Sequence, residues 1–366
     1  MFCFNIRVYK HTYCCTCCGN KIEKKDIHNS QLKRNGENSR RCSSCGENIV
    51  ENAGKYPQIV VSVVSSKKCD TKGFITSAIY KMRKFDNNLH IELVSETGSL
   101  KLGKTRSSFV GNVTLDVGVW SFDKIEKAYK DFFEDEHAQY PTFESEDPYD
   151  RAYIQSYTFE IKNTRNKKNA LLTIVEINER FLYEFRHFNE MYMMQDVLPD
   201  IKRILGNSGY VFLLLDPDDA KDPNLIDSVT TLRSYMGKDA LHAIIYYNKP
   251  ESMSMSRDRL EVKTMESLLK ANRRVINEKI CLSKENEPKL EHHRKCLYFT
   301  CSPEEHSDNN GVEKSLNCEL PFFWVLILEG IMNVWDNDEN GNWEVNRDSL
   351  RPDYWKCIEN RLYLRD

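Results

Sequence analysis

Five runs of almost uninterrupted apolar residues stand out along this chain, and each is bounded by polar segments. Such runs are typical of strands in a parallel sheet, because helices cover both faces of that sheet. After the first run, Ile75, Ile79 and Met82 recur at helical spacing and predict a helix with an apolar inward face. The pattern therefore predicts an α/β domain with central strands at residues 58–64, 169–176, 210–215, 241–247 and 295–300.

Weaker patterns predict further elements around this sheet. Residues 150–162 and 169–177 are joined by a short basic turn, so they should pair as antiparallel neighbours. A helix is expected over residues 121–137 and a buried helix over Pro321–Leu328, the most apolar stretch of the chain. Additional strands are expected at residues 89–94, 98–102 and 114–120.

Composition narrows the class of protein. The 366 residues are 40% hydrophobic, which is enough to bury a sizeable core, and the net charge of −3 provides no global basic field for nucleic acid. No run approaches the roughly 20 apolar residues of a membrane span, and the N-terminus lacks the apolar region of a signal peptide. We therefore expect a cytoplasmic protein with no membrane partner, in which the thirteen cysteines are metal ligands or core thiols.

Two CxxC pairs near the N-terminus predict a metal site. Each CxxC turn can direct two sulfurs at one ion, and two such turns complete a four-thiolate zinc site. A glycine follows the second cysteine of each pair, which suits the sharp turn there and favours this register over Cys14 with Cys17. A disulfide or unpaired thiols are the alternative. The predicted ligands of a structural zinc ion are Cys15, Cys18, Cys42 and Cys45.

Changes in composition divide the chain into four parts. They are a zinc ribbon at residues 1–50, a linker at 51–55, the main domain at 56–332 and a C-terminal extension at 333–366. The segment between the cysteine pairs is rich in lysine and arginine, so it could contact nucleic acid. An ordinary solvated surface is the alternative interpretation of that segment.

The first predicted strand is followed by a polar loop and a helix, which is the outline of a phosphate-binding loop. A working loop has two glycines that let backbone amides surround phosphates, then a lysine, then a hydroxyl that holds magnesium. Here Ser66 and Thr71 replace the glycines, Lys72 occupies the lysine position with its charge in water, and Gly73 replaces the hydroxyl. Hydrolysis is not expected from such a loop, and an ordinary connecting loop is the alternative.

The order and spacing of several motifs resemble the bacterial double-GTPase family, of the translation-factor class. The segment SAIY at 77–80 is similar to the AALY of such families, and LLLDP at 213–217 is similar to a strand of the family. Tyr140-Pro141-Thr142 resembles the first switch, and Glu319-Leu-Pro321 resembles the segment before the last helix. The other matched positions are Glu176, Glu179, Asn248, Lys249, Glu251 and Ser302.

This resemblance implies a Rossmann-like, P-loop GTPase-type sheet flanked by helices and preceded by the small zinc ribbon. Glu176 and Glu179 stand where a GTPase has aspartate and glycine, and Asn248-Lys249-x-Glu251 stands for the guanine-binding motif. Because no motif is intact, the resemblance implies a pseudo-GTPase, a scaffold or adaptor of a bacterial multi-component conflict or signalling system. It would dock protein partners through the zinc ribbon and the switch-like surface. The alternatives are a divergent weak GTPase or NTPase that binds GTP or another nucleotide, and a zinc-ribbon nucleic-acid-binding protein.

Overall fold

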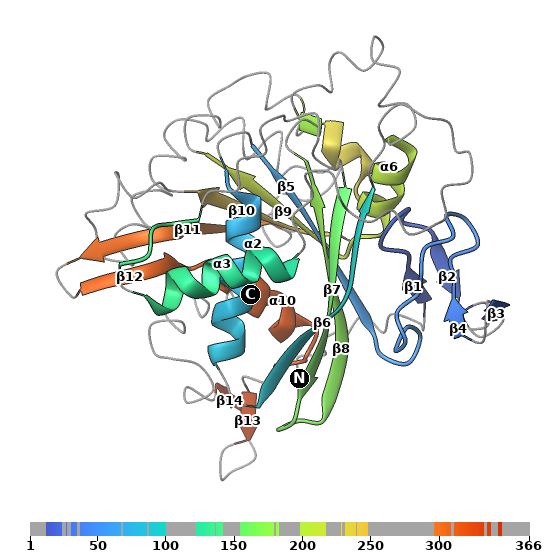
Figure 1. The fold of residues 1–366 in the computed structure, drawn as a ribbon, viewed down its shortest axis with the longest axis horizontal. Coiled ribbons are helices and arrows are strands. Elements are labelled where there is room, and N and C mark those ends of the chain that lie inside the picture. The colour runs from blue at the N-terminus through green and yellow to red at the C-terminus, as the bar shows by residue number, and fades with distance from the viewer. Residues whose placement is uncertain are drawn as a thin grey trace.

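The computed structural model has a mixed α/β fold with one central sheet flanked by helices (Figure 1). The N-terminal region that carries the four cysteines, here called the ribbon, lies beside the sheet as a separate group of short strands. The structure describes residues 12–23, 27, 31–34, 37–66, 69–85, 88–99, 122–135, 137–141, 154–178, 181–182, 198–216, 228, 231–238, 240–247, 296–308, 311–332, 335–337 and 343–345.

Among the described residues, eight strands form the central sheet in the order β12-β11-β10-β9-β5-β8-β7-β6. The five strands from β11 to β8 are parallel to one another. Strand β7 is antiparallel to β8, and the outer strands β6 and β12 are antiparallel to their neighbours. The strands are β5 (Gln58–Ser65), β6 (Leu89–Ser99), β7 (Ile154–Asn163), β8 (Lys168–Ile177), β9 (Tyr210–Leu215), β10 (Leu241–Tyr247), β11 (Cys296–Asp308) and β12 (Gly311–Leu316).

The five predicted central strands are confirmed, and so is the antiparallel pair on either side of the basic turn. One prediction at the edge of the sheet is wrong. Residues 89–94 and 98–102 are expected as separate strands, but β6 continues to Ser99, with one irregularity in register between Leu93 and Ser95, because Gly98 and Ser99 also pair with β7. Residues 100–102 lie outside the described residues. The strand expected at 114–120 lies outside the described residues.

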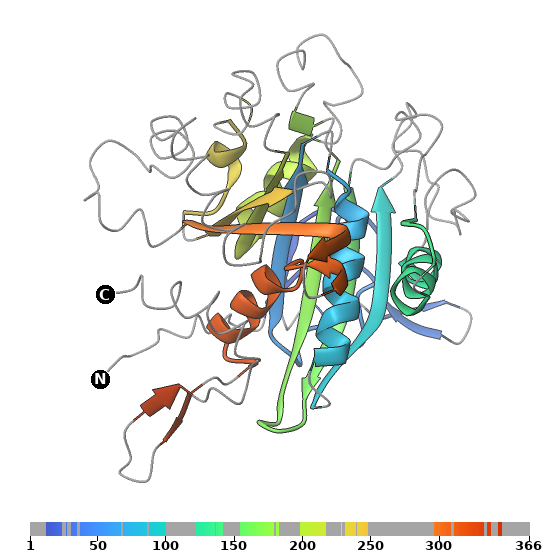
Figure 2. The ribbon, with the colours of Figure 1, turned by 90° about the vertical axis from the view of Figure 1, so that its left-hand side faces the viewer.

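Three helices lie on one face of the sheet (Figures 1 and 2). They are α2 (Thr71–Phe85), α3 (Phe122–Glu134) and α10 (Leu320–Leu328). As predicted, Ile75, Ile79 and Met82 of α2 are buried, and they share a core with the odd-numbered residues of β5. The predicted apolar helix is α10, and residues 320–327 are all buried. Alternate strand residues face opposite sides, so each strand contributes to two cores.

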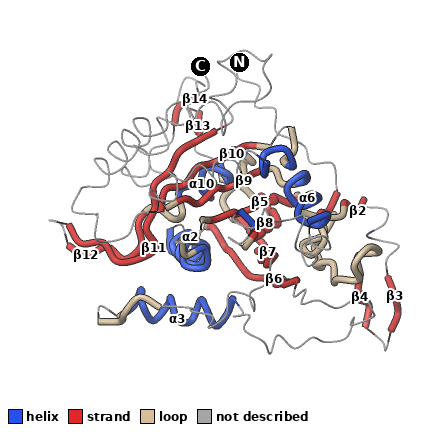
Figure 3. The backbone as a smooth tube through the Cα atoms, turned by 90° about the horizontal axis from the view of Figure 1, so that it is seen from above, coloured by secondary structure: helices blue, strands red, loops and turns tan. Residues whose placement is uncertain are grey.

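The other face is covered by α6 (Leu198–Asn207) and by the ribbon. Seen from above, α2 and α3 lie on one side of β5 and β8, whereas α6 lies on the other (Figure 3). Two antiparallel hairpins make up the ribbon, β1 (Thr12–Cys14) with β2 (Lys21–Glu23), and β3 (Gln31–Arg34) with β4 (Glu37–Arg40). A third hairpin pairs β13 (Trp335–Asn337) with β14 (Trp343–Val345) in the C-terminal extension. Within the described ranges, no helix combines the length and the apolarity that crossing a membrane requires.

The strand order reverses at β5. After β5 the chain builds β6, β7 and β8 on one side, and it then returns to build β9, β10 and β11 on the other. In open α/β sheets, ligands bind outside the carboxyl ends of the strands at such a reversal point. The segment that begins at Ser66 and leads into α2 starts there, so the fold brings the loop examined in the sequence to this position.

Candidate functional site

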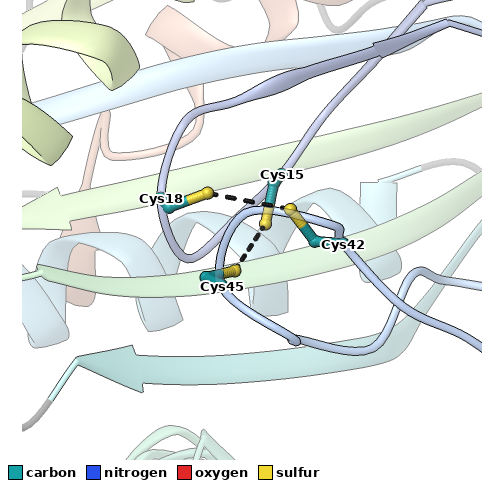
Figure 4. Close-up of side chains that lie close together, drawn as sticks. All are labelled: Cys15, Cys18, Cys42 and Cys45. Atoms are coloured by element: carbon teal, nitrogen blue, oxygen red, sulfur yellow. Dashed lines mark hydrogen bonds between the residues drawn. The ribbon is translucent and has the colours of Figure 1, made fainter. Parts of the chain in front are cut away.

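The side chains of Cys15, Cys18, Cys42 and Cys45 converge on one point (Figure 4). Their four sulfur atoms all lie within 4.8 Å of one another. The Cys15 and Cys45 sulfurs are 3.5 Å apart and the Cys18 and Cys42 sulfurs 3.8 Å apart, so neither pair is a disulfide, whose S–S length is about 2.05 Å. Four sulfurs at about 2.3 Å from a tetrahedral zinc ion would lie roughly 3.8 Å from one another. The cluster could therefore hold a metal ion, and its dimensions are compatible with zinc.

Both cysteine turns have the same backbone geometry. The amide of Gly19 donates to the carbonyl of Cys15 over 2.9 Å, and that of Gly46 donates to Cys42 over 2.8 Å. The φ angles of the two glycines are 69° and 77°, in the left-handed region that favours glycine. The alternative ligand Cys14 lies outside the group, and its thiol points at the Gly19 carbonyl oxygen over 3.5 Å.

The four thiols titrate as one group. Hydrogen bonds with the other three sulfurs raise the pKa of Cys15 and lower the pKa of Cys42. The hydrogen bond with Cys15 lowers the pKa of Cys18, but the bonds with Cys42 and Cys45 together with burial outweigh it, so the pKa is raised. A cation among these sulfurs would favour the thiolate form of every one of them, so metal binding should release protons.

At the predicted phosphate loop, the carboxylate of Asp70 occupies the N-terminus of α2. Its Oδ1 accepts the Gly73 backbone amide over 2.8 Å, which is the bond of a helix N-cap. Its Oδ2 accepts the hydroxyls of Tyr129 and Tyr140 over 2.7 and 2.6 Å. A helix N-terminus attracts anions because its free amides and its dipole favour negative charge. In this chain the protein's own carboxylate takes that place.

Burial raises the pKa of both Tyr129 and Tyr140, and the neighbouring charge of Asp70 raises them further. The two hydroxyls therefore remain protonated at neutral pH and can donate to the carboxylate. Their oxygens lie 2.8 Å apart, so the three side chains form one cluster. Tyr140 belongs to the segment that resembles a first switch, and the structure brings it onto the start of α2.

Lys72 is engaged inside the protein, which corrects the expectation that its charge lies in water. It is partly buried, and its Nζ donates to Oε1 of Gln155 on β7 over 3.3 Å. The Gln155 amide in turn donates to Glu96 on β6 over 3.0 Å, and Glu96 accepts the Phe122 amide at the start of α3. Burial raises the pKa of Glu96, whereas these hydrogen bonds and the charge of Lys72 oppose the rise.

Three of the remaining described positions have hydrogen-bond partners for their side chains, whereas the Ser302 hydroxyl has none among the described residues. The hydroxyl of Ser66 accepts the Asp216 amide over 3.0 Å, and Thr71 donates to Ser65 over 2.7 Å. Glu176 accepts the hydroxyl of Tyr157 over 3.4 Å, and Ser302 is fully buried in β11. The predicted positions that lie outside the described residues are Thr142, Glu179, Asn248, Lys249 and Glu251.

Sequence reasoning missed the residues that fill the loop. Asp70 had a local signal, because an aspartate directly before a helix is a preferred N-cap. Tyr129 and Gln155 had none, since they are 59 and 83 residues away from the groups they contact.

No protein-family model matches the chain, and neither does any curated protein. The fold and the sites therefore define its class. It is a mixed α/β protein with a central sheet flanked by helices and a cysteine cluster that could hold a metal ion.

Proposed function

We propose that this protein is a catalytically inactive, GTPase-like scaffold whose phosphate loop is filled by its own side chains. The observation that carries the proposal is the Asp70 carboxylate at the N-terminus of α2, held by the hydroxyls of Tyr129 and Tyr140. A nucleotide phosphate placed there would meet a negative charge instead of free amides.

The topology supports a relationship to nucleotide-binding sheets. The loop follows β5 at the reversal of strand order, and β7 pairs antiparallel with β8, as expected beside a GTPase sheet. The motif positions argue against catalysis on that sheet. Phosphoryl transfer needs magnesium and backbone amides directed at the terminal phosphate. Here Gly73 has no hydroxyl, its amide is bonded to Asp70, and Lys72 is bonded to Gln155.

We propose that the cysteine cluster binds structural zinc. Four sulfur ligands complete a tetrahedral site and leave no position for a substrate. The metal would then stabilise the fold, as it does in other small cysteine-rich modules.

The role as an adaptor in a bacterial conflict or signalling system comes from the family resemblance, whereas the cytoplasmic location is the expectation from the composition and its cysteines. A scaffold of this kind would act through protein partners that contact the ribbon and the switch-like surface. What supports it is the combination of a retained α/β sheet, a filled loop and a candidate metal centre in one chain.

The test is a titration of the purified, metal-loaded protein with GTP, GDP and ATP, with and without magnesium, together with a turnover assay. We expect turnover at background and no nucleotide affinity in the micromolar range. Asp70→Ala should increase the affinity for nucleotide or inorganic phosphate, because it removes the competing carboxylate. Asp131→Ala, an exposed charge on α3, is the matched control and should change nothing.

Three outcomes would contradict the proposal. Magnesium-dependent GTP turnover that Lys72→Ala abolishes would identify a divergent GTPase. Tight nucleotide binding by the wild-type protein would show that the loop is open. Retention on nucleic acid that falls steeply with salt would favour the nucleic-acid-binding alternative.

A further inference from the structure

The two cysteine turns have the same backbone geometry but different surroundings. Thr16 and Ser43 occupy equivalent positions, each directly after the first cysteine of its pair. Thr16 is 2% exposed, whereas Ser43 is exposed to solvent. The sheet domain therefore covers the first turn and leaves the second turn open.

Three side chains of the sheet domain donate hydrogen bonds to backbone carbonyls of the first turn. Ser156 of β7 donates to the Thr16 carbonyl over 3.1 Å. On α6, the Arg203 Nε donates to the Cys18 carbonyl over 3.0 Å, and the Asn207 amide donates to the Gly19 carbonyl over 2.8 Å.

The first cysteine turn also packs closely against α6. A Cβ atom added to Gly19 would lie 2.6 Å from the backbone nitrogen of Ile204, so only glycine fits against α6 at this point. The strand that leads into the turn is held as well. The side-chain amide of Gln58 makes two hydrogen bonds with the backbone of Cys14. Its Oε1 accepts the Cys14 amide over 2.7 Å, and its Nε2 donates to the Cys14 carbonyl over 3.1 Å.

We propose that Ser156, Arg203 and Asn207 are positioning residues of the metal centre, and that metal binding and folding of the α6 face are coupled through them. Groups that orient metal ligands from outside the coordination sphere typically change metal affinity 10- to 100-fold when they are removed. Among the described residues, no side chain of the sheet domain donates to a carbonyl of the second turn in this way, so the coupling should run mainly through the first turn. The inference rests on the proposed zinc site but not on the proposed GTPase-like scaffold, because it concerns the opposite face of the sheet.

The coupling must be reciprocal. If the contacts between α6, β7 and the first turn strengthen metal binding, then metal binding stabilises α6 and β7 by the same factor. Loss of the ion should therefore loosen the sheet domain as well as the ribbon, because the carbonyls that Arg203 and Asn207 bond to would move.

The first experiment measures the rate of zinc release to a chromophoric chelator. We expect Ser156→Ala, Arg203→Ala and Asn207→Ala to release zinc about tenfold faster than the wild type. Ser43→Ala should release zinc at the wild-type rate, because Ser43 lies in the exposed second turn. Lys202→Ala is a second control, since Lys202 is an exposed cation next to Arg203 on α6 and lies over the Tyr235 ring instead. Arg203→Lys keeps a hydrogen-bond donor, so it should release zinc more slowly than Arg203→Ala does.

The second experiment does not depend on variants that fold. Hydrogen exchange of the wild-type protein is measured with zinc bound and after chelation, and it is followed in α6, β7 and β10. We expect chelation to reduce protection in α6 and β7 more than in β10, which is separated from β7 by β9, β5 and β8 in the sheet. Equal release rates for Ser156→Ala and Ser43→Ala, or unchanged protection of α6 after chelation, would overturn the proposal.

Discussion

A Cβ atom added to Gly73 would lie 2.2 Å from the hydroxyl oxygen of Tyr140, a distance that real Cβ atoms essentially never show. The same atom would lie 2.3 Å from the carboxylate of Asp70 and from the hydroxyl of Tyr129. The missing side chain at Gly73 is therefore a packing requirement of this cluster. The position that would carry the magnesium-binding hydroxyl is filled by three oxygen atoms of other residues.

Gly73→Ser, which restores the hydroxyl of the working motif, should destabilise the protein without creating activity. Overpacking at a closely packed site costs about 1–3 kcal/mol, because neighbouring side chains must move. Chemical denaturation should show this loss, and GTP turnover should remain at background.

Gly206→Ala is the matched control, because the nearest atom to its added Cβ is 3.5 Å away. Gly206 lies within α6, where alanine is preferred over glycine by about 1 kcal/mol, so this variant should be as stable as the wild type or more so. A Gly73→Ser protein of wild-type stability would show that the Tyr140 cluster opens readily.

The sheet could be predicted from the sequence because its signal is local. The runs at β9 and β10 are apolar along their whole length, and the predicted and observed bounds agree. The four cysteines of the metal site could also be predicted from the sequence, since the CxxC spacing and the following glycine determine which sulfurs can meet.

The filled loop could not be predicted, because its contacts depend on the tertiary structure. Tyr140 lies 70 residues from Asp70 along the chain, and only the packing of α3 against α2 brings the two together. The same holds for the ribbon, whose first turn is held by residues more than 100 positions away, such as Ser156 and Arg203. A motif can therefore be identified in a sequence while the groups that occupy its site cannot.

Stability should fall as the pH rises above about 10. Tyr129 and Tyr140 have pKa values above the ordinary value near 10, so the unfolded chain loses these protons first and alkaline pH favours unfolding. Each such tyrosine contributes a slope of up to about 1.4 kcal/mol per pH unit between its unfolded and folded pKa values. Denaturant unfolding measured between pH 8 and pH 11 would give the slope.

Tyr140→Phe should make the pH dependence of stability shallower by the contribution of one tyrosine. Below pH 9 it should also lower the free energy of unfolding by about 1.5–3 kcal/mol, because a hydrogen bond to a charged carboxylate is lost. Equal slopes for the variant and the wild type above pH 10 would contradict the assignment of Tyr140 to the buried cluster.

One zinc ion per chain should bind at Cys15, Cys18, Cys42 and Cys45. X-ray absorption should show four sulfur neighbours at about 2.3 Å, and Cys42→Ser should lose the stoichiometric metal. Cys17→Ser is the control, because Cys17 lies in the same turn but outside the four-sulfur group, and it should retain the ion. Zinc-free protein by elemental analysis, or a disulfide at Cys15, would exclude the site.

Lys72→Ala tests whether the lysine of the loop binds a ligand or stabilises the fold. Lys72 donates to Gln155, which links it to Glu96 and to the start of α3, so its loss should reduce stability by about 1 kcal/mol. Lys127→Ala, on the exposed side of α3, should have little effect and is the matched control. Thermal unfolding and GTP turnover are measured on the same samples, and turnover should be at background in all three proteins. If Lys72→Ala leaves stability unchanged but weakens the binding of phosphate or nucleotide, then Lys72 is available to a ligand, and the internal bonds to Gln155 do not close the loop.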